Sequence, residues 1–265
     1  LLALAYVASK YYSPPRAIPM LRLAIEKAKS SNDLGLEHLC RSGLCAVYRQ
    51  SGEYARSVAE GALATAFARR TLNSQLEASN ITDMASAEMA RGSYEKSREL
   101  YESAIVVLGD HPDPSGLALA FSNLGELHLV SGRTSDAEQT FGRALMLARP
   151  LEVMVALLQA AGGMAMCAQR RGSNADLSHW CSELRAIGQG RERVFHDRWL
   201  TEAALAWDTA LNGVGFGRAD TDLLVALRDL RQRDVDHWLA LGLERLRLQE
   251  RFLGRTRAED YGVID

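Results

Sequence analysis

Residues 119–148 read LAFSNLGELHLVSGRTSDAEQTFGRALMLA, and this stretch decides the fold of the chain. Before Gly132, the apolar residues Phe121, Leu124 and Leu127 recur at three-residue steps, which is the spacing of one face of a helix. Glycine tolerates the left-handed backbone conformation that ends many helices. The stretch therefore predicts two antiparallel helices that are joined at Gly132.

The same pattern recurs four times at an interval of 40 residues. Each copy contains a glycine within a short pattern (RQSGEY, MARGSY, LVSGRT and QRRGSN), and these glycines are Gly52, Gly92, Gly132 and Gly172. A small or compact residue stands seven positions before each glycine, namely Cys45, Ala85, Gly125 and Ala165. Small residues let two helix axes approach closely. Because one hairpin cannot cover its own apolar face, we expect neighbouring hairpins to stack on each other.

These units resemble the tetratricopeptide repeat (TPR). The third unit matches the family signature best, through Phe121, Leu124, Gly125, His128, Gly132, Ala137, Phe141 and Ala144. The first and fourth units depart from it, because Gly61 and Cys181 stand where an aromatic residue is usual. The resemblance covers residues 1–230 and implies an all-α, right-handed superhelical solenoid of antiparallel helix hairpins. The period exceeds the family's common repeat of about 34 residues, as it does in long-helix members among bacterial regulators and in kinesin-light-chain adaptors.

The repeat pattern divides the chain into four parts. A truncated first repeat is expected over residues 1–36, and a core of four hairpins over residues 37–190. Residues 191–253 are expected to form a degenerate fifth hairpin and a C-terminal capping helix, and residues 254–265 a tail. The apolar positions of the capping helix do not fall on a single stripe, so its orientation is left open; they are Trp238, Leu241, Leu246, Leu248 and Phe252.

The chain holds none of the motifs that carry catalytic or metal chemistry. Its six histidines do not form the HExxH pair, and neither a GxSxG elbow nor a phosphate-binding P-loop is present. The glycine-alternating residues 213–217 follow a predicted helix rather than a strand, so we interpret them as a connection between helices. We therefore expect no enzyme activity, no metal and no cofactor.

Composition narrows the class of protein further. A formal net charge of −2 provides no general field that would attract nucleic acid or anionic lipid. No stretch approaches the roughly 18 apolar residues that a membrane span requires. Four cysteines are too few and too scattered for a disulfide scaffold, which favours a reducing compartment. We therefore expect a cytoplasmic protein that makes no direct contact with nucleic acid or membrane.

The resemblance also implies a ligand groove. In this family, ligands bind the concave face, which is lined by the first helix of each hairpin. The inward-facing positions carry over to Arg49, Gln50, Thr82, Asp83, Ser86, Asn123, Glu126, Gln169 and Arg170. The same rule adds Gln159 and, from the slipped fifth unit, Asp208. An ordinary solvated helix face is the alternative for this whole set.

Two acidic residues lie near the middle of this groove. We expect Asp83 and Glu126 to be exposed there, so that replacing either with arginine leaves the fold almost intact. Chaperone-binding members of the family hold a C-terminal carboxylate with lysine, arginine and asparagine. Here serine, threonine, aspartate and glutamate occupy the corresponding positions, and the two acids would repel a carboxylate. Acidic C-terminal tails are therefore not expected as partners.

The resemblance implies a non-catalytic domain that binds a protein or peptide partner through its concave groove, with homo-oligomer formation left open. Because the chain starts at Leu1 rather than at methionine, we expect a fragment of a larger bacterial protein of signalling or transcription regulation. The alternative is a ligand sensor, which binds a signalling peptide or small molecule and transmits its presence to an attached output domain. A deep pocket would favour the sensor.

Overall fold

A computed structural model describes residues 14–109, 114–189, 199–231 and 234–253. The regular structure of these residues is entirely helical, and nearly every helix has 14 to 18 residues. In chain order the helices are α2 (Pro14–Ser30), α3 (Leu34–Gln50), α4 (Tyr54–Arg70), α5 (Ser74–Ala90), α6 (Tyr94–Leu108), α7 (Ser115–Val130), α8 (Thr134–Ala148), α9 (Met154–Arg171), α10 (Asn174–Gly188), α12 (Trp199–Asn212), α13 (Phe216–Leu230) and α14 (Val235–Leu253). The longest of them is α14, with 19 residues.

Left-handed residues set the lengths of these helices. The four predicted glycines have φ values between 77° and 84°, and each lies between the two helices of a hairpin. The turns between hairpins use the same conformation without glycine, at Asn32, Leu72 and Glu152, with φ between 49° and 52°. After Gly52, the N–H of Glu53 donates to the carbonyl of Tyr48 at 2.8 Å, which closes the end of α3. These seven chain reversals thus share one backbone geometry.

The small residues of the repeat hold the helices of each hairpin together. Ser57 Oγ donates to the carbonyl of Cys45 at 2.7 Å, and 40 residues later Ser97 Oγ donates to the carbonyl of Ala85 at 2.8 Å. Both hydroxyls are fully buried. A serine is short enough to let the two backbones approach, and its hydroxyl satisfies its own hydrogen-bonding need against the partner helix.

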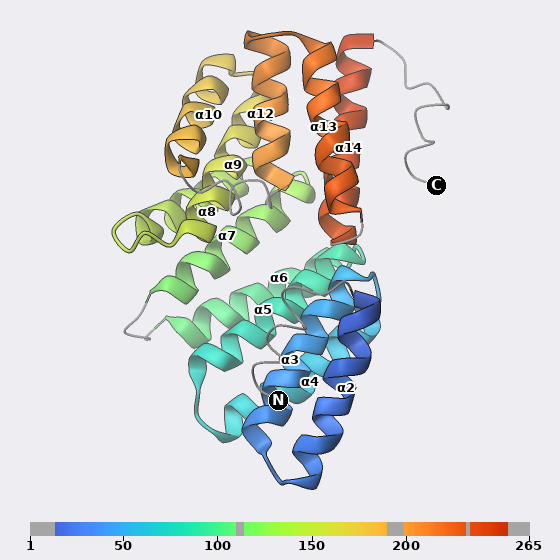
Figure 1. Ribbon diagram of the computed structural model, residues 1–265. Helices are drawn as coiled ribbons and strands as arrows, with labels where there is room; N and C mark the ends of the chain where they lie inside the picture. The colour runs from blue at the N-terminus through green and yellow to red at the C-terminus, as the bar shows by residue number, and fades with distance from the viewer. Residues whose placement is uncertain (1–13, 110–113, 190–198, 232–233, 254–265) are drawn as a thin grey trace.

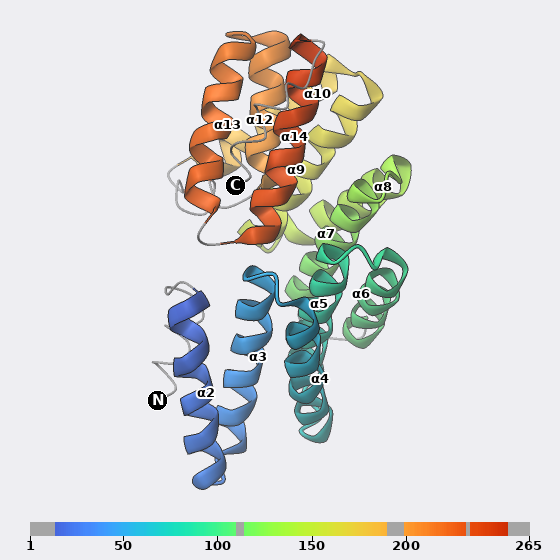
Figure 2. The same ribbon diagram turned by 90° about the vertical axis from the view of Figure 1, so that its right-hand side faces the viewer.

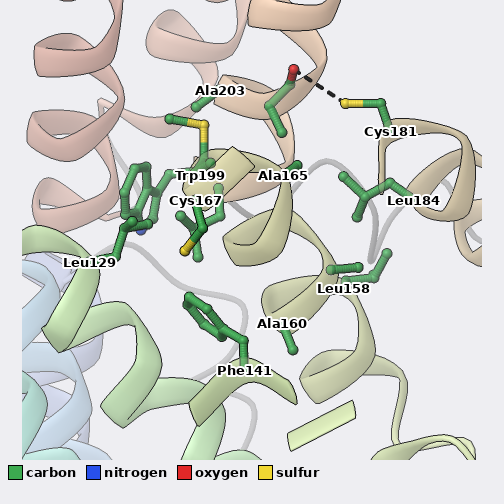
Figure 3. Close-up of a cluster of buried hydrophobic side chains, with 14 of the residues drawn as sticks. Leu129, Phe141, Leu158, Ala160, Ala165, Cys167, Cys181, Leu184, Trp199 and Ala203 are labelled. Atoms are coloured by element: carbon green, nitrogen blue, oxygen red, sulfur yellow. Dashed lines mark hydrogen bonds between the residues drawn. The ribbon is translucent and has the colours of Figure 1, made fainter. Parts of the chain in front are cut away.

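Aromatic side chains then join one hairpin to the next. Phe141 of α8 is fully buried and lies against Gly125 of α7 and Gly163 of α9, where a β-carbon on either glycine would overlap its ring. The largest apolar cluster extends from α7 to α14 and contains Phe141, Ala165 and Trp199, from three successive hairpins (Figure 3). In the first hairpin, Gly61 lacks the usual aromatic ring, and Met84 of the following hairpin occupies the space beside it.

The stacked hairpins form a curved solenoid, and its C-terminal helix returns towards its beginning. Successive hairpins run from α3 and α4 through α9 and α10 to the pair α12–α13 (Figure 1). Helix α14 packs on α12 and α13, and its first turn also contacts α3 (Figure 2). Arg49 at the end of α3 and Asp236 at the start of α14 are joined across 187 positions of sequence.

The predicted all-α solenoid of antiparallel hairpins with a C-terminal capping helix is therefore confirmed. The boundary that was predicted after residue 36 falls inside α3, which begins at Leu34. The first 13 residues of the expected truncated repeat and the tail expected over residues 254–265 lie outside the described residues. Among the helices that are described, none combines the length and the apolar character needed to cross a membrane.

The packing of Phe141 yields a paired test of this architecture. Gly163→Ala should lower the free energy of unfolding by about 1–3 kcal/mol, because the added methyl group overpacks against the ring. Gly142→Ala, at an open position within α8, should instead raise it by up to about 1 kcal/mol, because alanine favours the helix. Urea unfolding followed by circular dichroism measures both changes. Equal effects of the two substitutions would contradict the described contact.

Candidate functional site

A cavity of about 700 Å³ lies between the first helices of the repeats and α14. Helices α5 and α7 line it with hydroxyl, amide and carboxylate groups and with apolar side chains. Helix α14 lines it with both apolar and charged side chains. Residues from α3, α4, α6, α9 and α12 complete the lining. The cavity is therefore built from both ends of the chain as well as from its middle.

Seven of the nine predicted groove residues line this cavity: Arg49, Thr82, Asp83, Ser86, Asn123, Glu126 and Arg170. Gln159 also lines it, whereas Gln50 does not. Gln169 belongs to a separate shallow hollow beside Trp207. The expectation for Asp208 was wrong, because its carboxylate accepts a hydrogen bond from Ser178 and pairs with Arg185, both on α10.

One end of the cavity is an ionic contact between α3 and α14. Arg49 Nη1 donates to Asp236 Oδ2 at 2.6 Å. The other terminal nitrogen of Arg49, Nη2, lies 3.7 Å from Asp234 Oδ2. Tyr54 Oη donates to Asp236 Oδ1 at 2.8 Å. Asp234 also caps α14, because its side chain accepts from the backbone N–H of His237. We call Arg49, Tyr54, Asp234 and Asp236 the closure contact.

The charges in the closure contact perturb one another. Burial by itself lowers the pKa of Arg49, but the carboxylates of Asp234, Asp236 and Asp83 raise it well above its usual value. Burial raises the pKa of Asp236, and this effect exceeds the opposing influence of Arg49 and Tyr54. The pKa of Asp234 is lowered, because His237 and Arg49 outweigh the effect of its burial. Arg49 therefore stays charged and holds two carboxylates of α14.

A buried carboxylate occupies the other end of the cavity. Glu126 is only 7% exposed, which corrects the expectation that it is exposed in the groove. Trp199 Nε1 donates to Glu126 Oε1 at 2.7 Å, and Gln159 Nε2 donates to Glu126 Oε2 at 2.5 Å. The same Gln159 nitrogen donates to Asn123 Oδ1 at 2.9 Å. Glu126 thus links α7, α9 and α12, and an arginine there would be buried next to donors.

A second buried glutamate joins α9 and α12 to α14. Glu244 Oε1 lies 3.4 Å from Arg170 Nη2, and the same oxygen accepts from Arg247. Trp207 Nε1 approaches its other oxygen at 3.4 Å. Arg170 also donates to the carbonyl of Leu129 on α7. The guanidinium groups of Arg170 and Arg247 are therefore held by groups of the chain itself.

The residues between these ends can form hydrogen bonds with a bound chain. Thr82, Asp83 and Asn123 line the cavity and are partly exposed, and Ser86 shares a hydrogen bond of 2.8 Å with Tyr101 Oη. Hydroxyl and amide groups of this kind offer donors and acceptors without a fixed charge. This part of the cavity suits the alternating N–H and C=O groups of a peptide backbone.

Covalent chemistry is not favoured by the thiols that the structure describes. All four cysteines are buried, and burial raises the pKa of Cys45, Cys167 and Cys181 to about 12 in each case. A thiol reacts as its thiolate, so these groups are poor nucleophiles near neutral pH. Within the described parts of the chain, no group of three or more histidine, cysteine, aspartate or glutamate side chains has the arrangement of a metal site.

The repeat pattern of the sequence does not predict the contribution of α14 to the cavity lining. Asp236, Leu239, Leu243, Glu244 and Arg247 all line the cavity, yet the repeat pattern gives no inward-facing positions for this helix. The available signal was the irregular placing of its apolar residues. A helix with apolar side chains on more than one side indicates more than one contacting surface.

Comparisons with known proteins agree with this fold. No family model matches the sequence, and no curated protein sequence matches it either. Among solved structures, the chain is similar to a putative kinesin light chain from Podosopora anserina with nearly identical TPR-like repeats, at 16% identity and a TM-score of 0.54. That match covers 72% of this chain and 94% of the other. It is also similar to a Rap protein complexed with Competence and Sporulation Factor, at 14% identity and a TM-score of 0.62, covering 88% of this chain and 68% of the other. The fold is therefore a TPR-like helical solenoid.

The closure contact should appear as an energetic coupling between the two ends of the chain. In a double-mutant cycle of Arg49→Met and Asp236→Asn, we expect an interaction free energy of about 1–3 kcal/mol, because the pair is mostly shielded from solvent. The exposed pair Arg218–Asp222 on α13 serves as a matched control, for which about 0.5 kcal/mol or less is expected. Urea unfolding provides the four free energies of each cycle. A coupling no larger than that of the control would contradict the contact.

Because Glu126 is buried, we expect its replacement by arginine to destabilise the fold, whereas the same replacement at an exposed position would leave the fold almost intact. Glu126→Arg should lower the free energy of unfolding by at least about 2 kcal/mol, because it buries a cation beside the donors of Trp199 and Gln159. Glu126→Gln retains an acceptor and should lower it by about 1 kcal/mol. The control Glu99→Arg, on the exposed side of α6, should stay within about 0.5 kcal/mol of wild type. Thermal and urea unfolding measure all three, and a fully stable Glu126→Arg variant would show that this residue is not buried.

Proposed function

We propose that the chain is a non-catalytic recognition domain that binds a short peptide or peptide segment of a protein partner in its concave cavity. The observation that carries this proposal is the cavity itself, with a volume of about 700 Å³ and walls from α5, α7 and α14. Cavities of roughly 300–1,000 Å³ are typical of sites that enclose small ligands. The volume and the two-sided lining favour a narrow ligand over the surface of a folded domain.

The lining has the character of a peptide site. Thr82, Ser86 and Asn123 offer uncharged polar groups, and Leu239 and Leu243 of α14 offer apolar ones. An extended peptide combines the same two kinds of group, with polar groups along its backbone and side chains projecting to either side. The fold supports the proposal, since one structure of similar fold is a Rap protein complexed with Competence and Sporulation Factor.

We further propose that this domain belongs to a larger bacterial regulatory protein of the cytoplasm. The 40-residue period and the resemblance to long-helix regulators support this context. In such a protein, the bound partner would change the stability of the solenoid, and an attached domain would respond to that change. The closure contact between α3 and α14 lies in the lining of the cavity, so a bound partner would be next to it.

A sensor for a non-peptide small molecule is the second candidate. It is favoured by the volume of the cavity, about 700 Å³, because ligand sensing requires a deeper pocket than scaffold binding does. The two candidates differ in the ligand class that stabilises the protein. A ligand present at a hundredfold excess over its Kd adds about 2.7 kcal/mol to the free energy of unfolding.

Thermal unfolding in the presence of peptide and metabolite libraries tests both candidates. The variant Ser79→Trp fills the cavity from an exposed position of α5, and Ser103→Trp places the same residue on an exposed position of α6 outside it. We expect peptides to raise the melting temperature of wild type and Ser103→Trp, but not that of Ser79→Trp. Stabilisation by metabolites alone would favour the second candidate. Peptide stabilisation that persists in Ser79→Trp would place the binding surface elsewhere.

A further inference from the structure

We infer that α14 is a second recognition wall, and that it selects peptide segments with uncharged apolar side chains and rejects acidic ones. This inference rests on the proposed function and names the chemistry of its ligand. It concerns a helix outside the repeat pattern, whereas the groove predicted by that pattern is built from the first helices of the hairpins alone.

The first observation is a pair of leucines on the cavity side of α14. Leu239 and Leu243 are one helical turn apart, both line the cavity, and they are 45% and 57% exposed. Other side chains of the same helix, Leu241 and Leu248, are fully buried in the C-terminal core. The helix therefore has a second apolar surface that no part of the described chain covers, and this surface lines a partly open cavity.

The apolar surface continues on neighbouring elements. Ala240 lies between the two leucines, and Val155 and Leu119 line the same cavity from α9 and α7. A single exposed leucine is ordinary on a protein surface. Several apolar groups around one cavity form a site where an apolar side chain can leave water, which is the main favourable contribution to binding small ligands.

The second observation is the distribution of charge around the cavity. The lining contains three guanidinium groups, from Arg49, Arg170 and Arg247, and each is bound to a carboxylate of the chain. It contains four carboxylates, which belong to Asp83, Glu126, Asp236 and Glu244. An acidic ligand would meet this excess of negative charge and would have to displace a carboxylate of the protein from each arginine. The occupant that fits is therefore apolar and uncharged.

Four pools of short peptides provide the probe. Each pool contains N-acetylated, C-amidated hexapeptides whose two central residues are fixed as Leu-Leu, Ser-Ser, Lys-Lys or Glu-Glu, with the flanking positions randomised among alanine, serine and asparagine. Binding is followed by isothermal titration calorimetry. We expect the Leu-Leu pool to bind tightest, the Ser-Ser and Lys-Lys pools at least tenfold more weakly, and the Glu-Glu pool not measurably.

Variants on α14 then locate the contact. The best Leu-Leu peptide should bind L243E at least tenfold more weakly than wild type. The matched control L253E lies on the same helix, replaces a leucine that is 55% exposed, and does not line the cavity, so its affinity should stay within twofold of wild type. Leu243→Lys should gain measurable affinity for the Glu-Glu pool, because it adds a cation to the lining. The three arginines already present there are each paired with a carboxylate of the chain.

The outcomes separate this inference from the proposed function. Absence of binding by every pool would overturn the proposed peptide recognition, and the inference with it. Binding of the Glu-Glu pool as tightly as the Leu-Leu pool, or equal affinities of L243E and wild type, would overturn the inference alone. In that case, loss of binding in Ser79→Trp would still support peptide recognition in the cavity. The expected order of pools, together with the difference between L243E and L253E, would establish α14 as the selecting wall.

Discussion

A left-handed residue at steps of 20 positions, with position 112 outside the described residues, is the constraint on which the rest of this structure depends. Gly52, Gly92, Gly132 and Gly172 end the first helices of the hairpins, and Asn32, Leu72 and Glu152 end the helices between them. Because the steps are equal, the helices have nearly equal lengths, and residues 40 apart come to equivalent places. This equivalence lets the same serine hydroxyl donate to the same backbone carbonyl in successive hairpins, as Ser57 and Ser97 do.

The fold was predictable because four of these seven reversals carry glycine, a residue type that reveals them. Glycine at a positive φ repeats visibly in the sequence, whereas Leu72 and Glu152 adopt the same conformation with residue types that give no signal. The turn at Leu72 nevertheless closes with the same local hydrogen bond as the glycine turns, since the N–H of Asn73 donates to the carbonyl of Ala68. The backbone pattern is therefore more regular than the sequence pattern that predicts it.

The candidate site was predictable only as far as the repeat extends. Positions on the first helices carried over correctly into the cavity, as Asp83 and Asn123 show. The environment of Glu126 did not, because it depends on Trp199, which lies 73 positions later in a unit whose register has slipped. Asp208, in that same unit, turned away from the cavity towards α10 for the same reason. Contacts between distant segments leave no periodic signal once the period is lost.

The apolar residues of α14 are irregularly spaced because the helix contacts two different surroundings. Its buried residues Leu241 and Leu248 pack on the C-terminal core, while Leu239 and Leu243 face the cavity. A helix with two apolar surfaces does not have its apolar residues on a single stripe. The irregular pattern in the sequence of α14 is therefore two overlapping apolar patterns. Asp234, which caps this helix, and Asp236 in its first turn attach it to Arg49. The wall of the cavity and its attachment to the first hairpin thus belong to one continuous helix, so the position of Leu239 and Leu243 depends on the closure contact as well as on the C-terminal core.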